Sequence, residues 1–202
     1  MRLILASASP RRAELLRAAG YHFEAWPVEV DERIGPEERA EQYVVRLALE
    51  KSARALERWR TLEPGASESP IFLGADTSVV VDDEILGKPI DAADAARMIR
   101  RLAGRSHQVL TGVSLRRNEA EAHAVETTHV WFGSMTVEEI EWYVATGEGL
   151  DKAGAYAIQG VAARFIPKIE GCYSNVVGLP ISLIGWLMRE LDGNVRLASS
   201  RY

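Results

Sequence analysis

The chain has 202 residues, of which 47% are hydrophobic and 26% are charged. This composition is ordinary for a folded globular protein, and it excludes intrinsic disorder, collagen-like repeats and a coiled coil as descriptions of the whole chain. The formal net charge of -5, from 24 basic and 29 acidic residues, makes the chain a poor candidate for binding duplex nucleic acid, although a local cluster of positive charge can still bind a small anion.

The sequence also bears on the compartment. Cys172 is the single cysteine, which excludes an intramolecular disulfide framework and a multi-cysteine zinc site and fits a reducing environment. The apolar run at 3–6 is shorter than the roughly 7–15 residues of a signal-peptide core. The apolar stretch at 176–188 is shorter than the roughly 20 residues of a membrane span. We therefore expect a cytoplasmic protein whose partners are neither membranes nor nucleic acids.

Helix caps, turn residues and hydrophobic periodicity predict a mixture of helices and strands. In the first half of the chain we expect a strand at 3–6, a helix from Pro10 to Gly20, a strand at 21–28, a helix from about 36 to 59, and strands at 71–75 and 78–81. A helix at 91–102 and strands at 107–116 and 122–132 follow. The last part should hold a helix from the capping box at 136–139 to about 147, strands at 165–169 and 173–177, a helix from 180 to about 192, and a frayed tail to Tyr202. This order favours an α/β fold on a mixed sheet, as a single domain over 1–202 with two lobes.

The segment from Ser7 to Arg12 lies between the first strand and the start of a helix. Backbone N–H groups at a helix start are unpaired, and the helix dipole there favours anions. The hydroxyls of Ser7 and Ser9 and the guanidiniums of Arg11 and Arg12 add donors that suit phosphate oxygens. A helix start with serine and arginine is also common as a purely structural feature, and no Walker loop occurs in the chain.

Two carboxylates are candidates for catalysis or metal binding. Asp76 follows an apolar run and precedes Thr77; a carboxylate there is costly to bury unless it is solvated, paired or bound to a metal. Strand ends are where α/β sheets build their sites, but Asp76 could also simply form a turn. Glu32 is either a second functional carboxylate or a solvated surface acid. A divalent cation such as Mg²⁺ would take oxygen ligands like these two, with water and substrate phosphates completing its shell.

Three lysines and a glutamine complete the candidates. Lys51 lies on the apolar face of the long predicted helix, where it either snorkels to water or points into a cleft and meets an anion. Lys88 occupies a stiff Gly-Lys-Pro turn and is either exposed or functional. Lys152 and Gln159 lie in the glycine-rich stretch 147–160, which is either a tight loop or a place where a backbone approaches a ligand and the amide reads the edge of a base.

Four motifs resemble the Maf family, whose members are nucleoside triphosphate pyrophosphatases once described as septum-formation inhibitors. They are LILASASPRRAELLRAAG at 3–20, GADTSVVVDDEILGKP at 74–89, SHQVLTGV at 106–113, and the run from DKAGAYAIQG at 151–160 to FIPKIEGCYSNVVGLP at 165–180. The motifs follow in order, and the resemblance extends over nearly the whole chain.

The resemblance implies an α/β fold similar to that of inosine triphosphate pyrophosphatases, with an elongated mixed sheet, flanking helices and a central cleft between two lobes. It implies hydrolysis of a nucleoside triphosphate to the monophosphate and diphosphate, aided by Mg²⁺ or Mn²⁺. The family's general base falls on Asp76 and its metal-binding acids on Glu32 and Asp76. Its substrate-binding positions fall on Ser7, Arg11, Arg12, Lys51, Thr77, Lys88, Lys152 and Gln159.

The family has branches with different substrates. Arg11, Thr77 and Gln159 resemble the branch that acts on dTTP and UTP, which we expect to be the substrates here. The alternatives are a 7-methylguanosine triphosphate pyrophosphatase and a nucleotide-binding regulator of cell division or septum formation with little turnover. Trp131 and Trp142 could serve a homodimer interface, although core packing explains them equally well.

Overall fold

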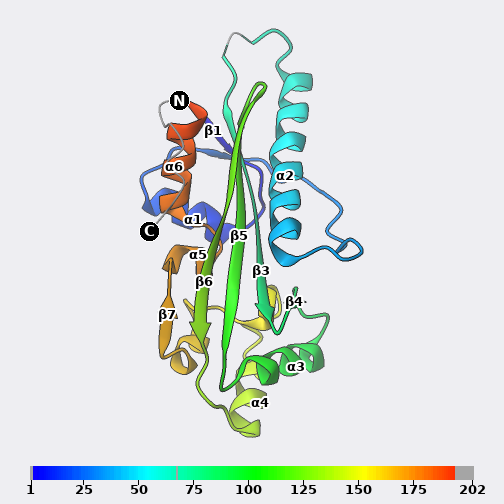
Figure 1. Ribbon diagram of the computed structural model, residues 1–202, viewed down its shortest axis with the longest axis vertical. Coiled ribbons are helices and arrows are strands. Elements are labelled where there is room, and N and C mark those ends of the chain that lie inside the picture. Colours follow the sequence, from blue (N-terminus) through cyan, green and yellow to red (C-terminus); the bar gives the residue numbers. More distant parts are fainter. Residues whose placement is uncertain (1, 67, 194–202) are drawn as a thin grey trace.

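A seven-stranded mixed sheet runs the length of the molecule in the computed structural model, which describes residues 2–66 and 68–193 (Figure 1). Its strand order is β2-β1-β3-β5-β6-β7, with β4 paired to β3. The strands are β1 (Leu3–Leu5), β2 (Glu24–Ala25), β3 (Ile71–Val81), β4 (Glu84–Leu86), β5 (Ser106–Arg117), β6 (Ala120–Trp131) and β7 (Lys168–Glu170). β1 is parallel to β2 and β3, and the other pairs are antiparallel. The predicted α/β class and mixed sheet are confirmed.

The helices flank this sheet, and α1, α3 and α4 begin at caps that the sequence predicts. They are α1 (Pro10–Ala18), α2 (Ala40–Leu62), α3 (Ala92–Leu102), α4 (Val137–Ala145), α5 (Tyr173–Val177) and α6 (Ile181–Leu191), with short 3-10 segments η1 (Ala153–Ala155) and η2 (Val161–Phe165). The side chains of Ser9, Asp91 and Thr136 each accept a backbone N–H at a helix start. Within the described ranges, no helix has both the length and the apolar character needed to cross a membrane.

β3 is one continuous strand, whereas the sequence predicted a break at Asp76 and Thr77. Both residues stay in the ladder with β5, Asp76 opposite Gly112 and Thr77 opposite Thr111. Their polar side chains do not end the strand because each has a partner: the carboxylate of Asp76 accepts a hydrogen bond from Lys51, and the two threonine hydroxyls bond each other. Asp76 therefore lies in the middle of the sheet and not in a turn.

Helix α2 lies directly on the backbone of β3 and β5. A Cβ atom on Gly74 would lie 2.1 Å from the carbonyl oxygen of Ala48, and one on Gly112 would lie 2.2 Å from that of Val44. Since no Cβ tolerates such distances, the two glycines are what allow this close approach. The approach brings the side chains of α2 within reach of polar groups on the middle of β3.

The start of α2 differs from the prediction. The sequence placed it near 36, but the helix begins at Ala40 and reaches Leu62, so the predicted loop at 61–70 is shorter. Glu37 has a φ of 55, which a right-handed helix cannot contain. The N-cap is Arg39, whose N–H donates to the side chain of Gln42. Residues 31–38 consequently form an irregular segment beside the helix.

Among the described residues, the two largest of four apolar clusters lie in the two lobes of the molecule. One core joins β1, α1 and α6, and the other joins α3, α4 and the far ends of β3 and β5. Figure 1 shows these helix pairs at opposite ends of the long strands. Along β3, Ala75 belongs to the first core and Val79 to the second, so Asp76 falls between them. The expected two-lobed arrangement is present, and the boundary between the lobes coincides with the polar stretch of β3.

Three predicted strand segments are wrong in extent or type. The strand at 21–28 is reduced to Glu24–Ala25, since Pro27 has no N–H to continue the ladder. The segment 165–169 gives way to β7 at Lys168–Glu170. The segment 173–177 is helix α5. Gly171, with a φ of 123, turns the chain away from the sheet edge before this helix. At its end, Gly178 donates its N–H to the carbonyl oxygen of Ser174. The expected frayed tail lies outside the described residues.

Candidate active site

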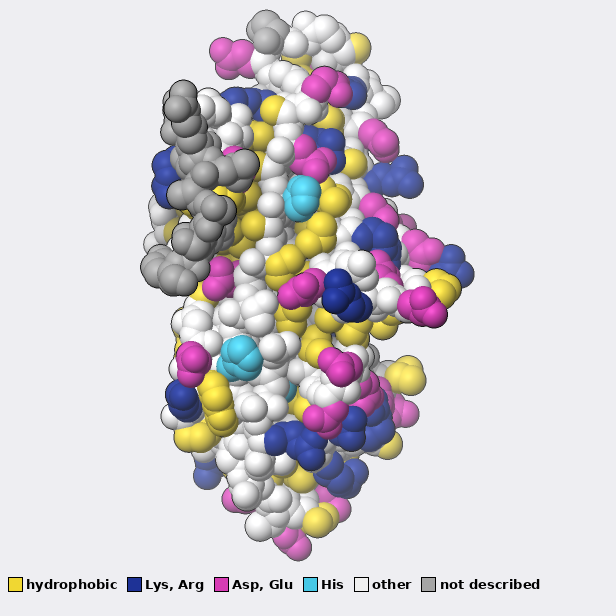
Figure 2. All heavy atoms as spheres, viewed as in Figure 1, with side chains coloured by type: hydrophobic (Ala, Val, Ile, Leu, Met, Phe, Trp, Pro, Cys, Tyr) yellow, Lys and Arg dark blue, Asp and Glu magenta, His cyan; other side chains and the backbone are white. Residues whose placement is uncertain are grey.

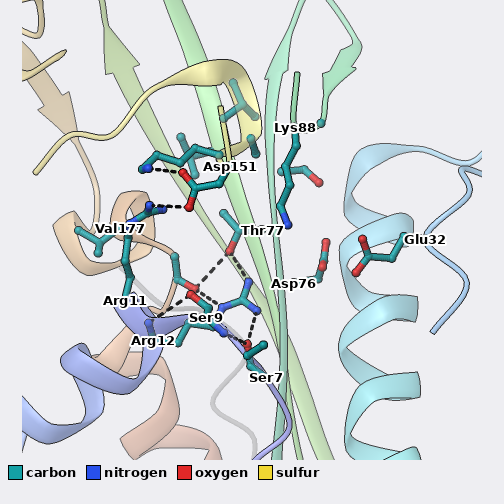
Figure 3. Close-up of a pocket in the computed structure, with 18 of the residues that line it drawn as sticks. Ser7, Ser9, Arg11, Arg12, Glu32, Asp76, Thr77, Lys88, Asp151 and Val177 are labelled. Atoms are coloured by element: carbon teal, nitrogen blue, oxygen red, sulfur yellow. Dashed lines mark hydrogen bonds and ion pairs between the residues drawn. The ribbon is translucent and has the colours of Figure 1, made fainter. Parts of the chain in front are cut away.

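A cavity of about 700 Å³ opens between the two lobes. Figure 3 shows that its walls come from the start of α1, the middle of β3, the irregular segment before α2, the turn after β4 and the loop around residue 151. Nine of the ten predicted site residues line it: Ser7, Arg11, Arg12, Glu32, Lys51, Asp76, Thr77, Lys88 and Lys152. Gln159 is exposed and does not line the cavity.

Asp76 is the most buried acid of the cavity, with 8% of its surface exposed. Its Oδ1 accepts a hydrogen bond from Lys51 Nζ at 2.7 Å. Burial raises the pKa of Asp76 above its usual value, and the positive charges of Lys51 and Arg12 oppose that rise. A carboxylate whose proton affinity is raised is a better proton acceptor than an ordinary surface aspartate, so Asp76 has the environment that a general base requires.

Lys51 points into the cavity and does not snorkel to water. The residue lies on the face of α2 that packs on the sheet and is 8% exposed. Its Nζ donates to Asp76 at 2.7 Å and to Glu32 Oε1 at 2.9 Å. A buried ammonium is stable only when it is paired, and here two carboxylates from distant parts of the chain pair with it. Lys51 is therefore the bridge that unites the two predicted acids.

Glu32 and Asp76 form a donor set that fits a hard divalent cation. Within residues 2–66 and 68–193, no group of three or more His, Cys, Asp or Glu side chains could hold a metal ion. Mg²⁺, however, is commonly held by one or two carboxylates together with water and substrate phosphates. Glu32 and Asp76 are two carboxylates that lie near each other at Lys51, and Glu32 is open to solvent, since 58% of its side chain is exposed.

Arg12 ties three parts of the chain together beneath the cavity. Its Nε donates to the carbonyl oxygen of Gly178 at 2.9 Å, Nη1 donates to that of Ala75 at 2.9 Å, and Nη2 donates to Thr77 Oγ1 at 3.1 Å (Figure 3). Nη1 also lies 3.3 Å from Ser7 Oγ. Burial lowers the pKa of Arg12, an effect that the nearby Asp76 and Glu32 oppose. Most donors of this guanidinium are thus committed to protein acceptors, and its position is fixed by them.

Arg11, Lys88 and Lys152 bring positive charge to other sides of the cavity. Arg11 Nη2 lies 3.3 Å from Asp151 Oδ2, which joins the start of α1 to the loop of the other lobe. Lys152 bonds the same carboxylate and the carbonyl oxygen of Glu148. Lys88 extends from the turn after β4 toward the side that holds Asp76 (Figure 3). All three cations line the same cavity, so together they can attract a polyanion to it.

Tyr43 and Asp151 line the cavity although sequence reasoning did not single them out. Burial, together with the negative charges of Asp76 and Glu32, raises the pKa of Tyr43 to about 12. The phenol therefore keeps its proton at neutral pH and donates it to the carbonyl oxygen of Glu32 at 2.8 Å. The sequence could have indicated Tyr43, because it lies eight residues before Lys51 in α2 and residues at that spacing share a helix face.

Comparisons with known proteins agree with the motifs. The family described as Maf-like protein matches residues 2–191. The dTTP/UTP pyrophosphatase of Symbiobacterium thermophilum is 54% identical over 179 residues, which cover 89% of this chain and 88% of that protein. The proteins of the same name from Anaeromyxobacter dehalogenans strain 2CP-C and Photobacterium profundum are 50% and 47% identical, covering 93% and 90% of this chain and 93% and 92% of their own lengths. The chain belongs to the Maf family.

Proposed function

We propose that this protein is a nucleoside triphosphate pyrophosphatase that hydrolyses dTTP and UTP to the nucleoside monophosphate and diphosphate. The observation that carries the proposal is the triad of Glu32, Lys51 and Asp76 at the floor of a cavity lined by further cations. The names of the relatives from Symbiobacterium thermophilum, Anaeromyxobacter dehalogenans and Photobacterium profundum support the same activity and substrates.

In this proposal Asp76 acts as the general base. It orients a water molecule and accepts its proton while the water oxygen bonds to the α-phosphorus. The bond from the α-phosphorus to the bridging oxygen breaks, and diphosphate leaves. The raised pKa of Asp76 favours proton transfer to it. Mg²⁺ or Mn²⁺ bound by Glu32 and Asp76 would supply positive charge for the phosphate oxygens.

The cations of the cavity stabilise the charge that moves onto the leaving diphosphate. Arg11, Lys88 and Lys152 line the cavity, and Lys51 lies next to the proposed base Asp76. Ser7 Oγ accepts the N–H of Ser9, which shapes the turn before α1 and presents its N-terminus to an anion. Donors that are fixed before the reaction stabilise developing charge without a reorganisation cost. Arg12 contributes to this stabilisation indirectly, because it holds Ser7 and Thr77 in place.

Incubating the purified protein with Mg²⁺ and a panel of triphosphates tests the proposal. We expect nucleoside monophosphate and diphosphate as first products, and in ¹⁸O-labelled water the label should enter the monophosphate. Label in the diphosphate would mean attack at the β-phosphorus and would contradict the proposed alignment. Absence of diphosphate release, with nucleotide binding retained, would favour a regulator with little turnover.

The same panel tests the substrate branch. We expect dTTP and UTP to be hydrolysed well above CTP, ATP and GTP, because a site that bonds two carbonyls and one N–H of uracil or thymine rejects a base that presents an amine there. Of the three residues that match the pyrimidine branch, Thr77 and Arg11 line the cavity and Gln159 does not. The proposed reading of the base by Gln159 requires its amide to reach the bound nucleotide, and Gln159→Ala should then narrow the difference in rate between substrates more than it slows the best one. A preference for 7-methylguanosine triphosphate would instead assign the protein to the branch of the family that acts on that nucleotide.

Location and assembly complete the proposal. We propose a cytoplasmic enzyme, which the single Cys172 supports. We also propose a homodimer. In the structure Trp142 is 44% exposed and stacks with Arg164, whereas Trp131 lies under the ammonium of Lys168. Light scattering of the purified protein and of Trp142→Ala measures the assembly state directly.

A further inference from the structure

Residues 31–38, called the Glu32 segment below, have no regular secondary structure, yet they carry one of the acids of the site. A catalytic side chain on an irregular segment is placed accurately only if something else holds the backbone. In this structure the holding groups come from α2. They are distinct from Lys51, which contacts the carboxylate of Glu32 and not its backbone.

Three successive carbonyl oxygens of the segment accept hydrogen bonds from two side chains of α2. Arg46 Nη1 donates to Asp31 O at 3.2 Å, Tyr43 Oη donates to Glu32 O at 2.8 Å, and Arg46 Nη2 donates to Arg33 O at 3.0 Å. The guanidinium therefore straddles the residue that bears the functional acid. A lysine at position 46 could not do this, because its donors radiate from a single atom whereas those of arginine form a planar fork.

Arg46 is itself fixed by a second acid of the same segment. Its Nε and Nη2 bond Glu38 Oε1 and Oε2 at 2.7 and 2.9 Å, and Nη1 reaches Glu50 at 3.3 Å. Glu38 Oε2 also accepts the N–H of Gly35 at 2.8 Å. The bidentate geometry defines the orientation of the fork. Arg46 thus clamps the segment at both ends, at 31–33 and at 38.

The helix register connects this clamp to the reaction centre. Tyr43, Arg46, Glu50 and Lys51 are spaced three, seven and eight residues from the first, so they share one face of α2. The helix that bonds the backbone on both sides of Glu32 through Arg46 also bonds the carboxylates of Glu32 and Asp76 through Lys51. Arg46 is not among the residues that line the cavity, so its effect on the reaction is indirect, and its backbone bonds on either side of Glu32 point to the position of that acid.

We propose that Arg46 is a positioning residue that sets the carboxylate of Glu32 against Lys51 and Asp76. The catalytic part of this inference rests on the proposed function. Displacing a catalytic group by about 1 Å can cost on the order of 100-fold in rate. Loss of the clamp should therefore lower kcat and leave KM nearly unchanged, because the phosphate-binding cations lie elsewhere.

A double-mutant cycle tests the catalytic part. Arg46→Ala should lower kcat by about tenfold or more in the otherwise unchanged protein, and by less than about twofold in a Glu32→Ala background, because there is then no acid to position. Arg46→Lys should not restore the rate. Arg54→Ala is the matched control: Arg54 lies on the same helix and pairs with Glu57 at the surface, and its loss should leave kcat within about twofold of the unchanged protein. Equal losses in both backgrounds would overturn the proposal.

Hydrogen–deuterium exchange tests the structural part without reference to turnover. Arg46→Ala should speed exchange of the amides of 33–38 and leave those of α2 unchanged. Tyr43→Phe, which removes only the hydroxyl, should speed exchange in the same segment to a smaller extent. It provides a second variant if Arg46→Ala does not fold. Unchanged exchange in the segment would overturn the proposal. If the unchanged protein hydrolyses no triphosphate, the proposed function fails, and exchange still decides whether Arg46 holds the segment.

Discussion

Lys51 Nζ lies 2.7 Å from Asp76 Oδ1 and 2.9 Å from Glu32 Oε1. The ammonium compensates two carboxylates that come from a strand and from an irregular segment. Its positive charge opposes the rise in the pKa of Asp76 that burial causes, and thereby favours the carboxylate form that can accept a proton. The predictions below test this pairing and the contacts that create it.

Asp76→Asn should lower kcat by about 10²–10⁴-fold, because the amide has nearly the shape of the carboxylate but cannot accept a proton as a base. The measurement is diphosphate release at saturating substrate. Circular dichroism and thermal unfolding serve as controls for the fold. A variant that keeps more than half of the unchanged rate would rule out the assigned role.

Lys51→Met should raise the pKa of Asp76 further. Burial already raises it, and the positive charge of Lys51 is the largest opposing effect. Removing that charge disfavours the carboxylate, so protonation should begin at higher pH. The acidic limb of activity should move in the same direction, since the base must be deprotonated. The check is a ¹³C NMR titration of the Asp76 carboxyl group in metal-free protein, with Lys168→Met, a change at an exposed lysine, as the control. A fall in the pKa would contradict the pairing.

Arg12→Ala and Arg11→Ala should differ in stability although both slow hydrolysis of every triphosphate. Arg12 bonds two backbone carbonyls and Thr77, and leaving such buried acceptors unpaired lowers the free energy of unfolding by about 1–3 kcal/mol. Arg11 forms a single long ion pair with Asp151, whose loss should cost at most about 1 kcal/mol. Urea unfolding of both variants measures the difference. Equal destabilisation would show that the bonds from Arg12 to Gly178, Ala75 and Thr77 do not stabilise the fold.

Gly112→Ala should destabilise the protein by about 1–3 kcal/mol and lower activity, because the added Cβ would collide with Val44 O and push α2 away from the sheet. That displacement would separate Lys51 from Asp76. Gly185→Ala is the matched control, since its Cβ meets nothing closer than 3.7 Å in helix α6 and alanine favours a helix over glycine by about 1 kcal/mol. A Gly112→Ala variant with unchanged unfolding and activity would refute the close packing of α2.

The sequence by itself determined the features that depend on short-range physics. The caps at Ser9, Asp91 and Thr136 are local hydrogen bonds between residues three apart, so their spacing is visible in the chain. Most of the predicted site residues lie in the quoted motifs, with Glu32 and Lys51 as the exceptions, and nine of the ten line one cavity. Asp76 illustrates the limit, because its chemistry was predicted while its position inside a continuous strand was not.

Only the tertiary structure decided how these residues meet. Whether the side chain of Lys51 points to solvent or into the cleft depends on how α2 lies against Gly74 and Gly112. That contact joins segments more than twenty residues apart in the sequence. The segment at 173–177 has a strand-like composition, but the turn at Gly171 removes it from the sheet edge and it becomes α5. Glu32 is placed by Arg46 and Tyr43 across an irregular segment. Periodicity and caps carry no information about such contacts, since long-range packing fixes them after the local elements have formed.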